Sequence, residues 1–114
     1  FFLGSDSAPH PTSSKSPAFM EQSEPSPCAA GVYTSPILVP LVATLLESFG
    51  ALDKLEGYVS TNGRTFYGVS PKAGDQLKLR RVTDGAKVPG LIKGAEGIEV
   101  VPFWAGKALG WEIV

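Results

Sequence analysis

The feature that most constrains this chain is an apolar segment at residues 37–49, which would leave almost no side of a helix polar. Its leucine, isoleucine and valine side chains occur at most helical positions, so the segment predicts a helix that is buried on most sides. Gly50 is the expected stop, and either Pro36 or Pro40 can occupy the first turn, where a missing N–H costs nothing. A helix of this kind needs partners from several directions, so the rest of the chain must pack around it.

Length and composition limit what the chain can be. Its 114 residues suffice for one small domain, whereas a whole (β/α)₈ barrel takes roughly 250 residues. Apolar residues make up 43% and charged residues 18%, as in globular proteins. Ten basic against eleven acidic residues argue against a general binder of nucleic acid or of anionic membranes. One cysteine excludes an internal disulfide, and one cysteine with one histidine cannot close a four-ligand zinc site of nitrogen and sulfur donors.

The start of the chain and its apolar stretches bear on location. The chain opens on Phe1-Phe2-Leu3, with no initiator methionine and no signal-peptide pattern, so we expect it to begin inside a longer protein. Its longest apolar stretch, residues 32–50, contains two prolines and Glu47 and falls short of the ~20 apolar residues of a membrane span. We therefore expect a cytoplasmic protein without a membrane partner.

The remaining pattern predicts a mixed α/β chain with a small β-rich tail. Residues 1–5 are typical of a buried strand, residues 9–27 of a loop rich in proline and serine, and residues 51–59 and 61–67 of two helices. After Pro71 the period becomes two. This alternation predicts a hairpin of residues 77–82 and 86–89 around Thr83-Asp84-Gly85, then strands at residues 98–101 and 108–114 joined by a turn at residues 105–107.

The densest polar group follows the predicted first strand and consists of Ser5, Asp6, Ser7 and, after Ala8-Pro9, His10. In parallel α/β proteins, the side chains at the carboxyl ends of strands face the active site, so an aspartate there is a natural metal ligand or base. The residues alone leave a plainer alternative open, in which Asp6 caps a turn and His10 lies on the surface.

Four separated motifs resemble the dihydroorotase family, in its single-function type, within the amidohydrolase superfamily. They are FLGSDSAPH, then AGVY with Pro36, then GYVSTNG with FYG, and finally VPFWAG with Trp111. The motifs occur in one order over nearly the whole chain, and together they resemble the C-terminal third of the family's members. The most specific part is DSAPH with its spacing to Ala30-Gly31.

The resemblance implies a metal-dependent (β/α)₈ barrel with two zinc ions. Such an enzyme hydrolyses a cyclic amide C–N bond, interconverting L-dihydroorotate and N-carbamoyl-L-aspartate in pyrimidine biosynthesis, and we expect a homodimer. Residues 1–70 would supply the last barrel strand, a substrate loop and the following helices, and residues 71–114 a β-rich tail packed on the barrel.

The resemblance also implies roles for individual residues. Asp6 matches an aspartate that ligates one zinc, acts as general base on the metal-bound water and returns a proton to the leaving nitrogen. His10 matches a histidine that binds the substrate carboxylate, and Ala30 matches a residue whose backbone holds the same end of the substrate. Lys15 matches a lysine at the same offset, with a solvated loop lysine as the alternative. The family's other zinc ligands have no counterpart here, so we expect the isolated chain to be inactive.

Other prominent residues predict structure rather than chemistry. Cys28 has no basic neighbour to lower its pKa, and Asn62-Gly63 lacks the pattern of a phosphate loop. Five aromatic side chains of the second half are expected to pack the tail onto the barrel: Phe66, Tyr67, Phe103, Trp104 and Trp111. Three basic residues are expected to form a solvated strand face: Lys78, Arg80 and Arg81.

Two other functions remain possible at this point. A hydantoinase or allantoinase would share the aspartate after the last strand, but not the SAPH continuation with Ala30-Gly31. A non-catalytic binding module would use the proline-rich arm at residues 9–27 to dock on aromatic grooves of a partner. The irregular proline spacing of this arm speaks against the second alternative.

Overall fold

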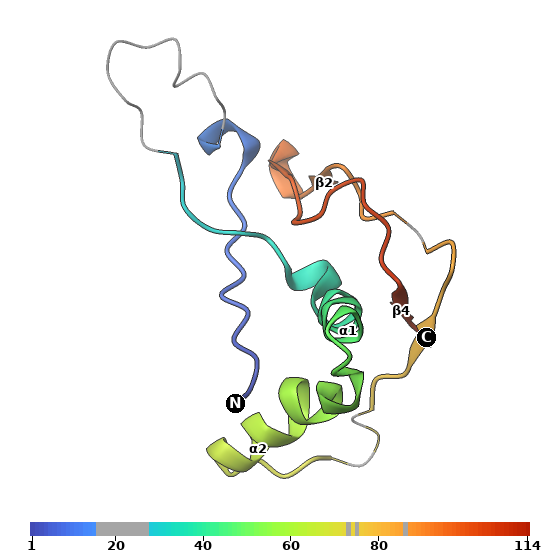
Figure 1. The fold of residues 1–114 in the computed structure, drawn as a ribbon. Coiled ribbons are helices and arrows are strands. Elements are labelled where there is room, and N and C mark those ends of the chain that lie inside the picture. Colours follow the sequence, from blue (N-terminus) through green and yellow to red (C-terminus); the bar gives the residue numbers. More distant parts are fainter. Residues whose placement is uncertain (16–27, 73, 75, 86) are drawn as a thin grey trace. The chain divides into compact units, whose positions relative to one another are not determined.

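The computed structural model describes residues 1–15, 28–72, 74, 76–85 and 87–114 (Figure 1). Most of the predicted loop at residues 9–27, including most of the proline-rich arm, lies outside the described residues. The chain forms two compact units, and each contains residues from both sides of the predicted boundary at residue 70. The first unit comprises Phe1–Ser5, Ile37–Ala86 and Ala108–Val114, and the second comprises Asp6–Pro36 and Lys87–Lys107.

The predicted apolar helix is confirmed. A 3₁₀ turn, η3 (Ser35–Ile37), leads into helix α1 (Leu38–Ser48), so both candidate prolines lie near its start. The chain leaves the helix through Gly50, which has the left-handed φ of +66° that glycine adopts without strain. Burial is less complete than predicted: the buried residues of α1 are Pro40–Ala43, and Phe49 just after it is 76% exposed, because the described residues cover only part of the helix surface.

The two helices predicted at residues 51–59 and 61–67 form one uninterrupted helical stretch. It begins with η4 (Leu52–Lys54), widens into the π-helical turn η5 (Gly57–Thr61) and ends with α2 (Asn62–Tyr67). Phe2 packs beside this stretch, with its ring 5.3 Å from that of Phe66 and 5.7 Å from that of Tyr67. The Phe2 ring also lies over Gly63, where a Cβ would be in ordinary van der Waals contact with it at 3.5 Å.

The strand predicted at residues 1–5 is not formed. Its described backbone contacts within the first unit go to the helical stretch instead: Leu3 N–H donates to the Tyr58 carbonyl at 2.9 Å, and Asn62 Nδ2 donates to the Phe1 carbonyl at 2.8 Å. A parallel strand takes its hydrogen bonds from strands beside it. No such neighbour runs along residues 1–5 in the described part of the chain, so the apolar pattern alone does not make a ladder.

The predicted hairpin of residues 77–82 and 86–89 is wrong. Strand β1 (Leu79–Arg81) pairs antiparallel with β4 (Trp111–Ile113) near the C-terminus, as Figure 1 shows. Arg80 lies opposite Glu112 and its guanidinium binds that carboxylate. The Val82 N–H continues the pairing by donating to the Gly110 carbonyl at 2.9 Å. This charge-complementary partner replaces the local one that the Thr83-Asp84-Gly85 turn suggested.

The second unit contains the other antiparallel pair, β2 (Ile92–Lys93) with β3 (Glu99–Val100), joined through the turn η6 (Ala95–Gly97). The predicted strands at residues 98–101 and 108–114 are therefore confirmed in their central residues, as β3 and β4. The predicted turn also occurs, with Trp104 and Gly106 at φ values of +60° and +77°. In the described part of the chain, no helix is long and apolar enough to cross a bilayer.

Candidate functional site

Two motif segments of the second unit lie side by side. Ser7 and Val32 form a parallel bridge, and the Ala8 N–H donates to the Val32 carbonyl at 3.0 Å. The Ser7 hydroxyl accepts hydrogen bonds from the backbone N–H groups of Thr34 and Ser35, both at 3.0 Å. The DSAPH segment is therefore bound along the AGVY segment by backbone and side-chain contacts.

Asp6 lies at the start of this paired stretch, where the chain passes from the first unit into the second. Its side chain is exposed and its φ is +42°, a left-handed value that few residues other than glycine adopt. Aspartate tolerates this conformation better than most residues, at a cost in strain. Conformations of this kind concentrate at functional sites, where the surrounding contacts impose them.

A pocket of about 220 Å³ opens beside the paired segments. Its polar lining includes the half-buried His10 and the exposed Lys15, and its apolar wall includes Tyr33, Val100 at the end of β3 and the three residues that follow it, 101–103. The Phe103 N–H donates to the Tyr33 carbonyl at 2.8 Å, which holds this wall in place. A pocket with two nitrogen-bearing side chains on one side and apolar groups on the other suits a small, flat anion.

Gly31 permits the close packing at this pocket. Its φ is +126°, and a Cβ there would lie 2.7 Å from the Ala8 Cβ and 3.2 Å from the His10 Cδ2. A real side chain at this position would displace one of those neighbours. Gly31 is thus needed for the two segments to meet as closely as they do.

The predicted site residues are only partly brought together. His10 lines the pocket, whereas Asp6 and Ala30 are not among its lining residues. Ala30 is exposed, and the carbonyls on either side of it, those of Ala29 and Gly31, accept hydrogen bonds from the Lys15 ammonium at 2.8 and 2.7 Å.

Sequence reasoning missed part of the pocket. It did not place Tyr33 in a pocket, and it assigned Phe103 to packing of the tail on the barrel, although both residues line the wall beside His10. One signal in the sequence could have predicted them: the AGVY and VPFWAG motifs, which contain these residues, belong to the same family resemblance as DSAPH.

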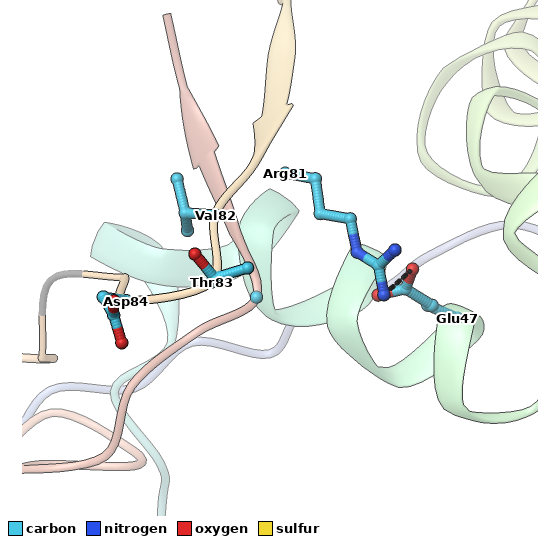
Figure 2. A pocket seen from close by; sticks show the side chains of 6 residues that line it. Glu47, Arg81, Val82, Thr83 and Asp84 are labelled. Carbon is cyan, nitrogen blue, oxygen red and sulfur yellow. Dashed lines mark ion pairs between the residues drawn. The ribbon is translucent and has the colours of Figure 1, made fainter.

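A second, more open pocket of about 780 Å³ lies in the first unit, and Figure 2 shows it. Arg81 reaches across it to Glu47 on α1, with 3.2 Å between the guanidinium and the carboxylate. The other carboxylate oxygen of Glu47 accepts a hydrogen bond from the Trp111 indole N–H at 3.1 Å. These charges already satisfy one another, so this contact joins β1 and β4 to α1 and does not make a ligand site. The arginines predicted as a solvated strand face therefore have specific partners.

Two neighbouring side chains outside both pockets, Asp53 and Lys54, shift each other's pKa. The Lys54 ammonium hydrogen-bonds the Asp53 carboxylate at 2.5 Å, which lowers the pKa of that carboxyl and raises the pKa of Lys54. Because the pKa of Asp53 is lowered in the folded state, the contribution of this pair to folding stability is present above the ordinary carboxyl pKa and is lost as the pH falls. Both side chains are largely exposed, so solvent and salt screen the attraction.

The described residues do not form a zinc site by themselves. Nowhere among them do three His, Cys, Asp or Glu side chains lie close enough together to hold a metal ion. Structural and catalytic zinc sites use three or four protein ligands, and Asp6 is the one ligand that the family resemblance assigns to this chain. Any zinc would need ligands from other residues.

The comparisons agree on one group of proteins. No protein-family model matches the chain. Dihydroorotase from Mycosarcoma maydis is 46% identical over 154 aligned residues, which cover 100% of this chain and 39% of the relative. The mitochondrial dihydroorotase of Arabidopsis thaliana is 41% identical and is matched over 98% of this chain and 26% of its own length. The chain thus spans well under half the length of these curated relatives.

Solved structures give the same result. The crystal structure of dihydroorotase from Saccharomyces cerevisiae, in complex with 5-fluoroorotic acid, matches with a TM-score of 0.80 and 33% identity, covering 100% of this chain and 30% of that one. Dihydroorotase from Campylobacter jejuni matches with a TM-score of 0.72 and 27% identity, over 98% and 28% of the two chains. These matches do not favour a hydantoinase, an allantoinase or a binding module. In sequence and in fold, nearly the whole of this chain is thus similar to part of the length of dihydroorotases.

Proposed function

We propose that this chain is the C-terminal portion of a dihydroorotase, a hydrolase that interconverts L-dihydroorotate and N-carbamoyl-L-aspartate in pyrimidine biosynthesis. The observation that carries the proposal is the pocket lined by His10 and Lys15, which the paired DSAPH and AGVY motifs form. Its size and its two nitrogen-bearing side chains suit a small carboxylate with a flat ring. The yeast relative was crystallised with 5-fluoroorotic acid, a molecule of that kind.

His10 and Asp6 would have different tasks. A histidine imidazole can donate a hydrogen bond to a carboxylate, which orients the substrate without taking part in bond breaking. The exposed carboxylate of Asp6 can accept a proton and return it to the leaving amide nitrogen when the ring opens. The backbone N–H of Ala30 would donate a further hydrogen bond to the carboxylate of the substrate, the group that His10 also binds.

The remainder of the active site would come from other parts of a (β/α)₈ barrel. In that barrel residues 1–5 would form the last strand, because the missing neighbours would supply their ladder, and residues 71–114 would pack outside as a tail. Two zinc ions would polarise the substrate amide and activate water, with Asp6 giving one of several ligands. A homodimer in the cytoplasm belongs to the same proposal, although the Arabidopsis relative carries a mitochondrial name.

The test uses the complete polypeptide that contains this chain. We expect zinc-dependent hydrolysis of L-dihydroorotate and no turnover of hydantoin or allantoin. Asp6→Asn should lower kcat by about 100-fold or more, since the loss of a general acid–base costs about 10²–10⁴-fold.

Asp84→Asn is the matched control, because Asp84 is also exposed but lines the other pocket. Its activity should equal that of the unsubstituted protein. An unsubstituted protein that purifies folded and zinc-loaded but leaves dihydroorotate intact would refute the proposed function.

A further inference from the structure

Lys15 makes an unusual pair of contacts for a loop lysine. Its ammonium donates hydrogen bonds to the carbonyls of Ala29 and Gly31, at 2.8 and 2.7 Å. Charged donors at such distances make stronger hydrogen bonds than neutral ones. A solvated lysine would leave its ammonium in water, so this geometry indicates a specific attachment to the loop on either side of Ala30.

The local backbone places Lys15 at this loop from a second direction. Residues Thr12–Ser14 form the 3₁₀ turn η1, and the Lys15 N–H closes it by donating to the Thr12 carbonyl at 3.0 Å. The Ala29 N–H then donates to the Ser14 carbonyl, also at 3.0 Å. The loop is therefore bound both to the turn backbone and to the side chain that follows the turn.

The planarity of the peptide group gives this attachment a consequence. In a trans peptide, the carbonyl of one residue and the N–H of the next point in opposite directions. Because the Ala29 carbonyl points at Lys15, the Ala30 N–H points away from it. An ammonium bound to the carbonyl also polarises the peptide and makes its N–H a better donor, as in a chain of hydrogen bonds.

From this geometry we infer that Lys15 is a positioning residue, which fixes and polarises the Ala30 peptide so that its N–H binds the carboxylate of the substrate. The inference rests on the proposed function, because that function supplies the carboxylate. Lys15 acts here through the backbone, and a direct role of its ammonium in bond breaking is not required.

The experiment compares Lys15→Met with Lys15→Arg in the complete polypeptide. Lys15→Met keeps the length of the apolar stem but removes both hydrogen bonds, so we expect KM for L-dihydroorotate to rise about 10-fold to 100-fold while kcat changes less than about 3-fold. Lys15→Arg keeps a charged donor and should restore KM to within about 5-fold. If Lys15→Met does not fold, Lys15→Gln replaces it, because glutamine is a neutral donor.

A matched ligand pair shows whether the effect runs through the carboxylate. 5-Fluoroorotate and 5-fluorouracil share one ring and differ in that group. In Lys15→Met, the inhibition constant of 5-fluoroorotate should rise about 10-fold or more, and that of 5-fluorouracil should stay unchanged.

The outcomes separate the two ideas. An inactive, folded and zinc-loaded unsubstituted protein contradicts the proposed function. An active protein in which Lys15→Met leaves KM and both inhibition constants unchanged overturns the inference alone. A fall in kcat at unchanged KM also overturns it, because Lys15 would then act in the chemical step.

Discussion

Replacing Gly31 with alanine tests whether the pocket depends on the close meeting of the two motif segments. At a φ of +126° a side chain costs about 1–3 kcal/mol of backbone strain. The new methyl group would lie 2.7 Å from the Ala8 Cβ, and overpacking of this kind costs typically about 1–3 kcal/mol. We therefore expect Gly31→Ala to lower the free energy of unfolding by roughly 2–6 kcal/mol, a large share of the roughly 5–15 kcal/mol of a typical domain.

Two further variants separate the causes. Gly90→Ala is the control in the same unit, because nothing lies within 4 Å of a Cβ there, and we expect a change of about 0.5 kcal/mol or less. Ala8→Gly removes the nearest atom that the alanine at position 31 would meet. Combined with Gly31→Ala, it should recover about 1 kcal/mol or more relative to the sum of the single substitutions.

The assay is urea unfolding of the complete polypeptide, followed by KM for L-dihydroorotate on the variants that remain folded. Gly31→Ala should raise KM as well, since its methyl group would also lie 3.2 Å from the His10 Cδ2 and displace the ring. Equal unfolding midpoints for Gly31→Ala and Gly90→Ala would refute the reasoning. So would a double variant without coupling, because the strain would then not come from the contact with Ala8.

Four substitutions, in two matched pairs, test how the first unit is held together, again by urea unfolding. Gly85→Ala would press its Cβ against the Leu109 carbonyl, a backbone atom that cannot move aside, and should lower the free energy of unfolding by about 3 kcal/mol or more. Gly110→Ala is its control, because a Cβ there meets side-chain atoms only at 3.8 Å, and it should change the unfolding midpoint little. Glu47→Leu leaves the Trp111 indole N–H without its acceptor and should cost about 1–3 kcal/mol, while Arg81→Met removes an exposed ion pair and should cost about 0–1 kcal/mol; equal losses for these two would contradict the assignment.

The candidate site could be predicted best where its residues are close in sequence or belong to one motif. Asp6 and His10 were singled out because a polar cluster after an apolar run is visible in the sequence itself. The family resemblance assigned His10 and Ala30 to the same end of the substrate, and the Ser7–Val32 bridge shows that their two segments lie side by side. The roles of Asp6, His10 and Ala30 in chemistry stay predictions.

The pocket wall could not be read from the sequence for a physical reason. The Phe103 N–H donates a backbone hydrogen bond to the Tyr33 carbonyl, and no pattern of side chains predicts which carbonyl will accept such a bond. The same holds for Lys15, whose contacts are with backbone carbonyls 14 and 16 residues away. Backbone acceptors are present at every residue, so only the folded path of the chain selects among them.

The failed hairpin shows the same limit at the level of strands. The Thr83-Asp84-Gly85 turn predicted a partner within a few residues, because turn chemistry is local. The chain instead pairs Arg80 with Glu112, 32 residues away, and Gly85 has no side chain because the Leu109 backbone lies against it. The glycine that suggested a turn is therefore needed for a close approach of two distant segments. A glycine in a strand pattern can indicate either a turn or the close approach of another backbone, and which of the two it is depends on the segment that the fold brings beside it.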